Sequence, residues 1–242
     1  TNNSSTESIF SIRNDALDNT GTNGALPSMY GAANLGARGL LAISPIIWNN
    51  AKWLETDKRR TQLYLTGANA NGASTVNVFT KKYTSYTERA DFAPQIRYAE
   101  VLLNSAEAEA RQATGVSDRA IALLNAVRNR ALAAPATEAY TAASFADKKA
   151  LVAAILLERR IEFLAEGKRW ADIHRNAVDA DFTTGGIPAK YANAAQGAAL
   201  YKVGAAVNPT QAAIPYADFR FIWPIPDTEK TQNPIIEQNP GY

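Results

Sequence analysis

The chain has 242 residues, with 25 Lys and Arg against 23 Asp and Glu, so its formal net charge is only +2. Apolar residues make up 46% and charged residues 20%, which is ordinary globular usage and excludes a disordered, collagenous or coiled-coil chain. So small a net charge gives no reason to expect a nucleic-acid partner. With no cysteine and a single histidine, His174, no metal site built on Cys or His and no cofactor is expected.

The N-terminal residues predict a linker followed by a strand. Residues 1–8 are polar and carry neither a basic start nor an apolar stretch, so they do not resemble a signal peptide. This linker-like start leads us to expect a fragment of a longer protein. Residues 8–12 have the mixed pattern of a short strand. No apolar run in the sequence reaches the roughly 18 residues that span a bilayer.

Residues 1–94 are predicted to form a loop-rich segment with a few short strands. Gly and Asn are frequent over residues 18–39, which predicts a long loop. Residues 44–54 place apolar side chains and two tryptophans at helical spacing, so a Trp-bearing helix is expected there. Residues 76–79 alternate as a strand does.

Residues 95–176 are predicted to form a helical core. Small and apolar residues repeat at steps of four, three and four over residues 96–113 and again after Ser117, a good N-cap. Two helices of this size predict a tetratricopeptide-type hairpin. A third helix is expected to open at Ser144, with Asp147 completing a capping box. Residues 177–242 carry scattered prolines and predict an irregular covering segment with an anchored tail.

Three segments together resemble the C-terminal domain of the SusD/RagB family, the cell-surface glycan-capturing lipoproteins of Bacteroidetes-type bacteria. The first is IRYAEVLLNSAEA at residues 96–108, followed by LNAVRNRA at 124–131. The second is ILLERRIEF at 155–163, running into EGKRWADIHR at 166–175. The third is the tail, with WPIP at 223–226 and the ending QNPGY. The three occur in the family's order.

The resemblance implies a mainly α, SusD-like fold: a tetratricopeptide-type hairpin, further helices, long irregular loops and a few short strands, in a single domain over residues 1–242. It also implies a non-catalytic protein on the outer-membrane surface that binds glycans and passes them to a SusC/RagA-like TonB-dependent transporter. Membrane attachment would come only from a lipid anchor that this chain does not carry. No catalytic or metal-binding residue is implied.

Several charged residues of the helical core are spaced by three or four: Arg159, Glu162, Glu166, Arg169 and Asp172. Such neighbours lie on one side of a helix, where they form ion pairs. A glycoside hydrolase instead needs two carboxylates that face each other across an open cleft. We therefore predict structural pairing here, with Glu100 or Glu107 paired to Arg128, Arg130 or Arg159.

The candidate ligand contacts come from the first segment. Tyr30, Trp48 and Trp53 lie outside the helical repeats, and their rings could stack on the C–H faces of sugars. Asn34, Asn49, Asp57 and Arg59 are the candidate partners of sugar hydroxyls, although Asp57 and Arg59 also suit a salt bridge at a helix end. Trp170 and Trp223 lie inside the family-like segments and are predicted to be core residues.

Two other classes of function stay open at this point. A tetratricopeptide-like module that binds proteins or peptides would need an open concave helical groove, which residues 182–218 are expected to cover. A glycoside hydrolase would show turnover of a glycan. No sequence motif indicates either one.

Overall fold

The computed structural model describes residues 5–70, 72, 76–192 and 198–242. Its contacts divide the chain into two compact units. The first comprises residues 1–168 and 193–207, and the second comprises residues 169–192 and 208–242. The division at residue 168 falls inside the predicted helical core, residues 95–176. The expected single domain over residues 1–242, with segment boundaries at 94 and 176, stays a prediction.

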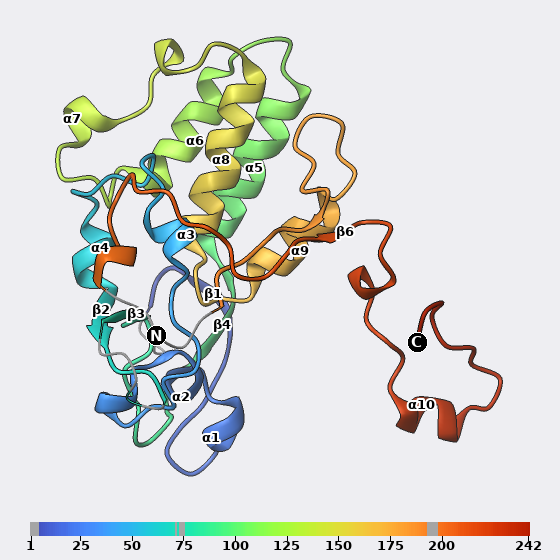
Figure 1. The fold of residues 1–242 in the computed structure, drawn as a ribbon. Coiled ribbons are helices and arrows are strands. Elements are labelled where there is room, and N and C mark those ends of the chain that lie inside the picture. Colours follow the sequence, from blue (N-terminus) through green and yellow to red (C-terminus); the bar gives the residue numbers. More distant parts are fainter. Residues whose placement is uncertain (1–4, 71, 73–75, 193–197) are drawn as a thin grey trace. The chain divides into compact units, whose positions relative to one another are not determined.

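Three helices lie side by side in the first unit: α5 (Tyr98–Gln112), α6 (Asp118–Arg128) and α8 (Lys148–Glu162) (Figure 1). The predicted stripe on α5 is the face that the structure buries, and it consists of Ala99, Leu103, Ala106 and Ala110. Three of these four are alanines, so the backbones of α5 and its partners can approach closely. The predicted mainly helical fold with an α5–α6 hairpin is confirmed.

The helix starts confirm one cap and correct another. Ser117 caps α6, since its side chain accepts the N–H of Ala120. The predicted start of the third helix at Ser144 is wrong, because Asp147 is itself the N-cap of α8 and accepts the N–H of Ala150. Ser144 ends a separate turn of 3-10 helix, Ala142–Ser144. A short helix, α7 (Pro135–Glu138), lies between α6 and that turn.

The described part of residues 1–97 contains four short strands, four one-turn α-helices and a turn of 3-10 helix, Ala33–Leu35. Strand β1 (Ser8–Ile12) pairs antiparallel with β4 (Ala93–Arg97), and β2 (Tyr64–Gly67) pairs with β3 (Asn77–Thr80). The long loop predicted over residues 18–39 contains α1 (Gly21–Gly24) and α2 (Leu26–Tyr30). The Trp-bearing helix predicted over residues 44–54 is only one turn long, α3 (Pro45–Trp48). It is followed by α4 (Lys58–Gln62).

Aromatic packing explains the apolar spacing that suggested a longer helix. Trp53 is completely buried beside Ile47 and Tyr64, with its ring centroid 5.7 Å from that of Tyr64. The Arg60 guanidinium lies 4.2 Å from the Trp53 ring centroid and donates to the carbonyl oxygens of Trp48, Trp53 and Leu54. One cation therefore holds the irregular backbone between α3 and α4 in place.

The second unit has a small core of Ile173, Ala177 and Phe221. Its elements are α9 (Lys168–Arg175), of which only the first residue belongs to the first unit, β5 (Gly186–Ile187), β6 (Ile214–Pro215) and α10 (Asp227–Gln232). The prediction that Trp223 is a core residue is wrong. The residue is 68% exposed, although its ring stacks on that of Trp170 with the centroids 5.3 Å apart.

No helix in the described ranges is both long enough and apolar enough to cross a membrane.

Candidate functional site

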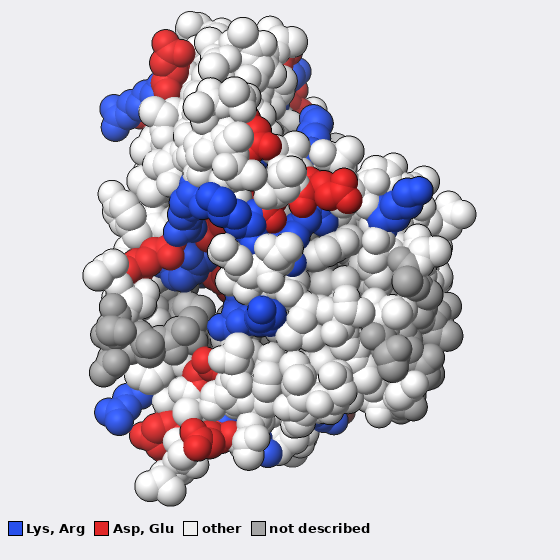
Figure 2. All heavy atoms as spheres, turned by 90° about the vertical axis from the view of Figure 1, so that its left-hand side faces the viewer, with Lys and Arg blue, Asp and Glu red and all other residues white. Residues whose placement is uncertain are grey.

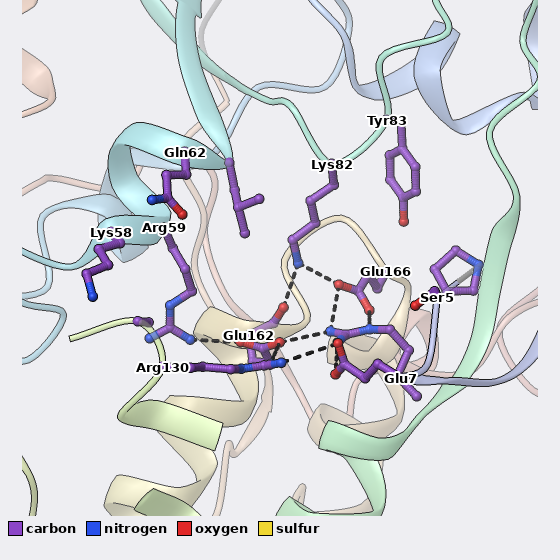
Figure 3. Close-up of a pocket in the computed structure, with 14 residues that line it drawn as sticks. Ser5, Glu7, Lys58, Arg59, Gln62, Lys82, Tyr83, Arg130, Glu162 and Glu166 are labelled. Carbon is purple, nitrogen blue, oxygen red and sulfur yellow. Dashed lines mark hydrogen bonds and ion pairs between the residues drawn. The ribbon is translucent and has the colours of Figure 1, made fainter. Parts of the chain in front are cut away.

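A pocket of about 420 Å³ opens in the first unit beside the C-terminal end of α8 (Figure 3). Its walls come from the residues before β1, from α4, from the chain after β3, from β4, and from the ends of α6 and α8. Its lining residues are Ser5, Glu7, Lys58, Arg59, Gln62, Leu63, Lys82, Tyr83, Pro94, Arg97, Arg130, Ala131, Glu162 and Glu166. Most of them are charged or polar, so the pocket presents many hydrogen-bonding groups.

Glu162, the last residue of α8, is the centre of the charge network. Its carboxylate accepts from Arg130 at 2.6 Å, Arg59 at 2.9 Å and Arg97 at 3.1 Å. Burial alone would raise the pKa of Glu162, but the charges of Arg130, Lys82, Arg59 and Arg97 outweigh it and lower that pKa to about 2. Glu162 is therefore a permanent anion at neutral pH.

Glu166 extends the network around the turn that follows α8. Ala165 and Gly167 flank it with positive φ angles of 63° and 78°, so the chain turns sharply there. The Glu166 carboxylate pairs with Lys82 at 2.5 Å and with Arg97 at 2.8 Å. Burial lowers the pKa of the Lys82 ammonium, although Glu166 and Glu162 act in the opposite direction.

Arg59 reaches the floor of the pocket from α4. Asp57 caps this helix by accepting the N–H of Arg59, and its carboxylate also binds the Arg59 guanidinium at 2.7 Å. Glu158 binds the same guanidinium at 2.7 Å. Burial alone would lower the pKa of Arg59, but Glu158, Asp57 and Glu162 raise it above its usual value. The guanidinium thus stays charged, and these carboxylates fix its position.

The mouth of the pocket is more exposed than its floor. Lys58 and Gln62 project from α4, and the side chains of Arg130 and Glu7 are 45% and 31% exposed. The main-chain N–H of Lys58 donates to the carbonyl oxygen of Ala131, which brings Lys58 beside Arg130. Figure 2 shows Lys and Arg side chains gathered across one face, with acidic side chains among them. A ligand would meet the exposed Lys58 and the part-exposed Arg130 first and buried ion pairs deeper in.

These groups can bind a polar ligand. Hydroxyl-rich molecules suit a pocket lined with Arg, Lys, Gln and Glu, because such side chains provide both donors and acceptors. Among the described residues, no group of three His, Cys, Asp or Glu side chains is arranged to hold a metal ion.

Two of the predicted ligand residues belong to this pocket. Arg59 lines it, and Asp57 holds Arg59 from behind. The helix-end salt bridge between Asp57 and Arg59 is present. Arg59 also lines the cavity, as contact with a sugar hydroxyl would require. Whether Arg59 binds a sugar hydroxyl stays a prediction.

Three of the other predicted residues lie around the aromatic core. Trp48 is half-buried and packs edge-on against Trp53, with their centroids 5.3 Å apart. No ring face of Trp53 is open, so a sugar could stack there only if the core opened. The side-chain amide of Asn49 donates to the carbonyl oxygens of Leu200 and Ala205. Asn49 therefore holds a neighbouring loop.

The last two predicted residues, Tyr30 and Asn34, lie at the end of α2 and just beyond it. Tyr30 is half-buried with its ring 6.5 Å from that of Tyr83, and the exposed Asn34 accepts the main-chain N–H of Ala68. Neither lines the pocket. Ligand contact by either residue stays a prediction.

The sequence analysis missed Arg97, Lys82 and Glu7 as pocket residues, and it expected other partners for Arg130. Arg97 stands at the start of the family-like run at residues 96–108, but its partners Glu7 and Glu166 are 90 and 69 positions away. Glu100 pairs with Lys168 instead of with one of the three predicted arginines. Glu158 and Glu162, which lie one helical turn apart in the family-like run at residues 155–163, were the available signal.

The comparisons with known proteins agree with this fold. A family model described as the SusD family matches residues 47–242. Among solved structures, a SusD superfamily protein from Bacteroides vulgatus matches with a TM-score of 0.67 and 20% identity over 99% of this chain and 47% of its own. Surface glycan-binding protein A from Bacteroides uniformis matches with a TM-score of 0.65 and 21% identity, over 98% and 49%.

A SusD superfamily protein from Bacteroides fragilis has a higher identity, 30%, with a TM-score of 0.54, over 71% of this chain and 36% of its own. This chain thus spans about half the length, or less, of these three solved structures. No curated protein matches it.

Proposed function

The chain belongs to the SusD family, and from this we propose that it is a non-catalytic glycan-binding protein of the bacterial cell surface. The observation that carries the proposal is the family match over residues 47–242. A surface glycan-binding protein among the structural neighbours supports it. The chemistry of the pocket supports it as well, because its side chains can both donate to and accept from sugar hydroxyls.

The state of Glu162 supports a role without catalysis. A glycoside hydrolase needs a carboxylic acid that is protonated near neutral pH, and enzymes obtain one by raising its pKa. The pKa of Glu162 is lowered to about 2 instead. The other buried carboxylate of the pocket, Glu166, is held in ion pairs with Lys82 and Arg97.

The finer parts of the proposal concern location and partner. We place the protein at the outer membrane, held by a lipid anchor outside this chain, where it delivers oligosaccharides to a SusC/RagA-like TonB-dependent transporter. These statements rest on the family alone. Co-purification of a transporter with the tagged protein from membranes would support them, and recovery of the protein without one would count against them.

Calorimetric titration of the 242-residue chain with a panel of oligosaccharides tests the central claim. A polar pocket whose charges are largely paired already supports binding in the micromolar to millimolar range, roughly −4 to −8 kcal/mol. Chromatography of the same mixtures should reveal no new sugar products. Release of shorter sugars would contradict the non-catalytic proposal, and an absence of binding across the panel would contradict glycan binding.

Two variants then separate the pocket from the aromatic residues. Gln62→Ala removes an exposed amide at the mouth and should weaken binding without lowering the melting temperature. Trp48→Ala tests stacking at the half-buried ring, and Trp53→Ala should lower the melting temperature because Trp53 is a core residue. If Trp48→Ala abolishes binding at unchanged stability while Gln62→Ala has no effect, the ligand binds at the aromatic residues rather than in the pocket.

A further inference from the structure

We infer that the pocket prefers glycans that carry carboxylates, such as uronic acids, and that the Glu7 side chain occupies the position which the ligand carboxylate would take. This inference rests on the proposed function and names the class of sugar. Five of the lining side chains are cations (Lys58, Arg59, Lys82, Arg97 and Arg130), and three are anions (Glu7, Glu162 and Glu166).

The deep charges neutralise one another. Glu162 and Glu166 are almost completely buried, and each binds two or more of the cations. Asp57 and Glu158 hold Arg59 from outside the lining. Arg59, Lys82, Arg97 and Arg130 are thus all engaged in ion pairs, and the remaining lining cation is Lys58, at the mouth. Within the described part of the chain, the Lys58 ammonium has no ion-pair partner.

Glu7 shows that a carboxylate fits beside these cations. Its carboxylate binds Arg97 at 2.6 Å and Arg130 at 3.3 Å, and Figure 3 shows it near the Arg130 guanidinium. Its side chain is 31% exposed, in contrast to the 8% and 4% of Glu162 and Glu166. Of the three pocket carboxylates, Glu7 is therefore the one that a ligand can displace most easily, because it is the least buried.

Lys58 completes the recognition of an acidic sugar. The Lys58 main chain donates to the carbonyl oxygen of Ala131, and the Lys58 side chain lies on the far side of Arg59 from the Arg130 guanidinium (Figure 3). A glycan that places one carboxylate at Arg130 and a second at Lys58 would gain the Lys58 charge, which Glu7 does not use. Gln62, one turn further along α4, is in position to bind a ring hydroxyl. A neutral sugar would gain only the hydroxyl contacts.

The test compares trigalacturonic acid with its methyl ester, because the two share one sugar skeleton and differ in charge. We expect the acid to bind the 242-residue chain more tightly and to lose that advantage at high salt. Lys58→Gln should weaken binding of the acid about fivefold, the effect of a single exposed ion pair, and leave the ester unchanged. Lys52→Gln removes an exposed lysine that does not line the pocket, so it should change neither.

A second variant tests the place of Glu7. Glu7→Gln removes the competing carboxylate and should strengthen binding of the acid, with binding of the ester unchanged. Melting curves on each variant separate these effects from unfolding. Equal affinities for acid and ester would overturn the inference while glycan binding stands, and binding of neutral sugars alone would do the same.

Two further outcomes are decisive. Binding of short polyglutamate as tight as that of trigalacturonic acid would overturn the assignment to a sugar, since the pocket would then recognise carboxylates on a polypeptide. If no glycan of the panel binds, charged or neutral, the proposed function itself fails. The failure of the inference and the failure of the function are thus distinguishable.

Discussion

In the layer of α5, α6 and α8, the backbone satisfies its own hydrogen bonds, whereas in residues 5–94 side chains satisfy many backbone groups. Arg60 alone binds three carbonyl oxygens, and Asn49 binds two more. Helices are recognised in a sequence because their period is local. An irregular segment depends on single side chains with distant partners, so it is harder to predict and more easily damaged by one substitution.

The two regions meet at the charged pocket, where the largest effect is expected. Glu162→Gln leaves Arg59, Arg97 and Arg130 without their shared carboxylate, and breaking a buried ion network of this kind costs about 3 to 5 kcal/mol. Urea unfolding measures the loss. Glu109→Gln is the control, because Glu109 pairs with the exposed Arg119 at 3.5 Å and should contribute about 0 to 1 kcal/mol. Equal costs for the two variants would contradict the central role of Glu162.

Acid should weaken the same network. The pKa of Glu162 falls from its usual 4.5 to about 2 on folding, so its contribution is complete above about pH 5 and is lost as the pH falls toward 2. The contribution amounts to about 3 kcal/mol. Urea midpoints measured between pH 7 and pH 2.5 should fall more steeply for the parent chain than for Glu162→Gln, which lacks this titration. Parallel curves would show that other carboxylates cause the acid sensitivity.

The sequence predicted the helical layer because each helix carries its own signal. The apolar stripe lies within α5 itself, and the capping residue Ser117 lies directly before α6. Each signal is therefore local to the helix that it predicts. The start of α8 was misplaced by three residues, because Ser144 and Asp147 are both good caps and only the tertiary structure selects between them. Trp223 was misjudged for a related reason, since nothing in the WPIP run indicates that one side of the ring stays uncovered.

The candidate site was only partly predictable. Arg59 and Asp57 were identified because a charged run after an apolar segment is conspicuous. The pocket also needs Glu7, Lys82, Arg97 and residues of α8, which the chain brings together over as many as 123 positions between Glu7 and Arg130. No spacing rule relates residues so far apart. Their convergence becomes visible only when β1, β4, α4 and α8 are placed together.

The irregular segment should be sensitive to the loss of Arg60. Arg60→Leu keeps much of the apolar contact with Trp48 and Trp53 but removes the donors to three carbonyl oxygens. Partial access of water limits the cost to about 2 kcal/mol, the range for a few unsatisfied groups. Arg13→Leu, at a side chain 76% exposed, is the matched control and should be close to neutral. An unchanged urea midpoint for Arg60→Leu would show that the Trp48–Trp53 packing holds this segment by itself.

The smallest effect is expected in the helical layer, at the cap of α6. Ser117→Ala removes one acceptor from the first turn of α6, the one that binds the N–H of Ala120, so the cost should be about 1 kcal/mol. Ser117→Asp should restore stability, because a carboxylate accepts the same N–H and also suits the positive end of the helix dipole. Urea midpoints of the two variants measure this difference. If Ser117→Ala costs as much as Arg60→Leu, the comparison of the two regions fails. One side-chain hydrogen bond would then contribute as much in the helical layer, where the backbone satisfies its own hydrogen bonds, as in the irregular segment, where side chains must satisfy them.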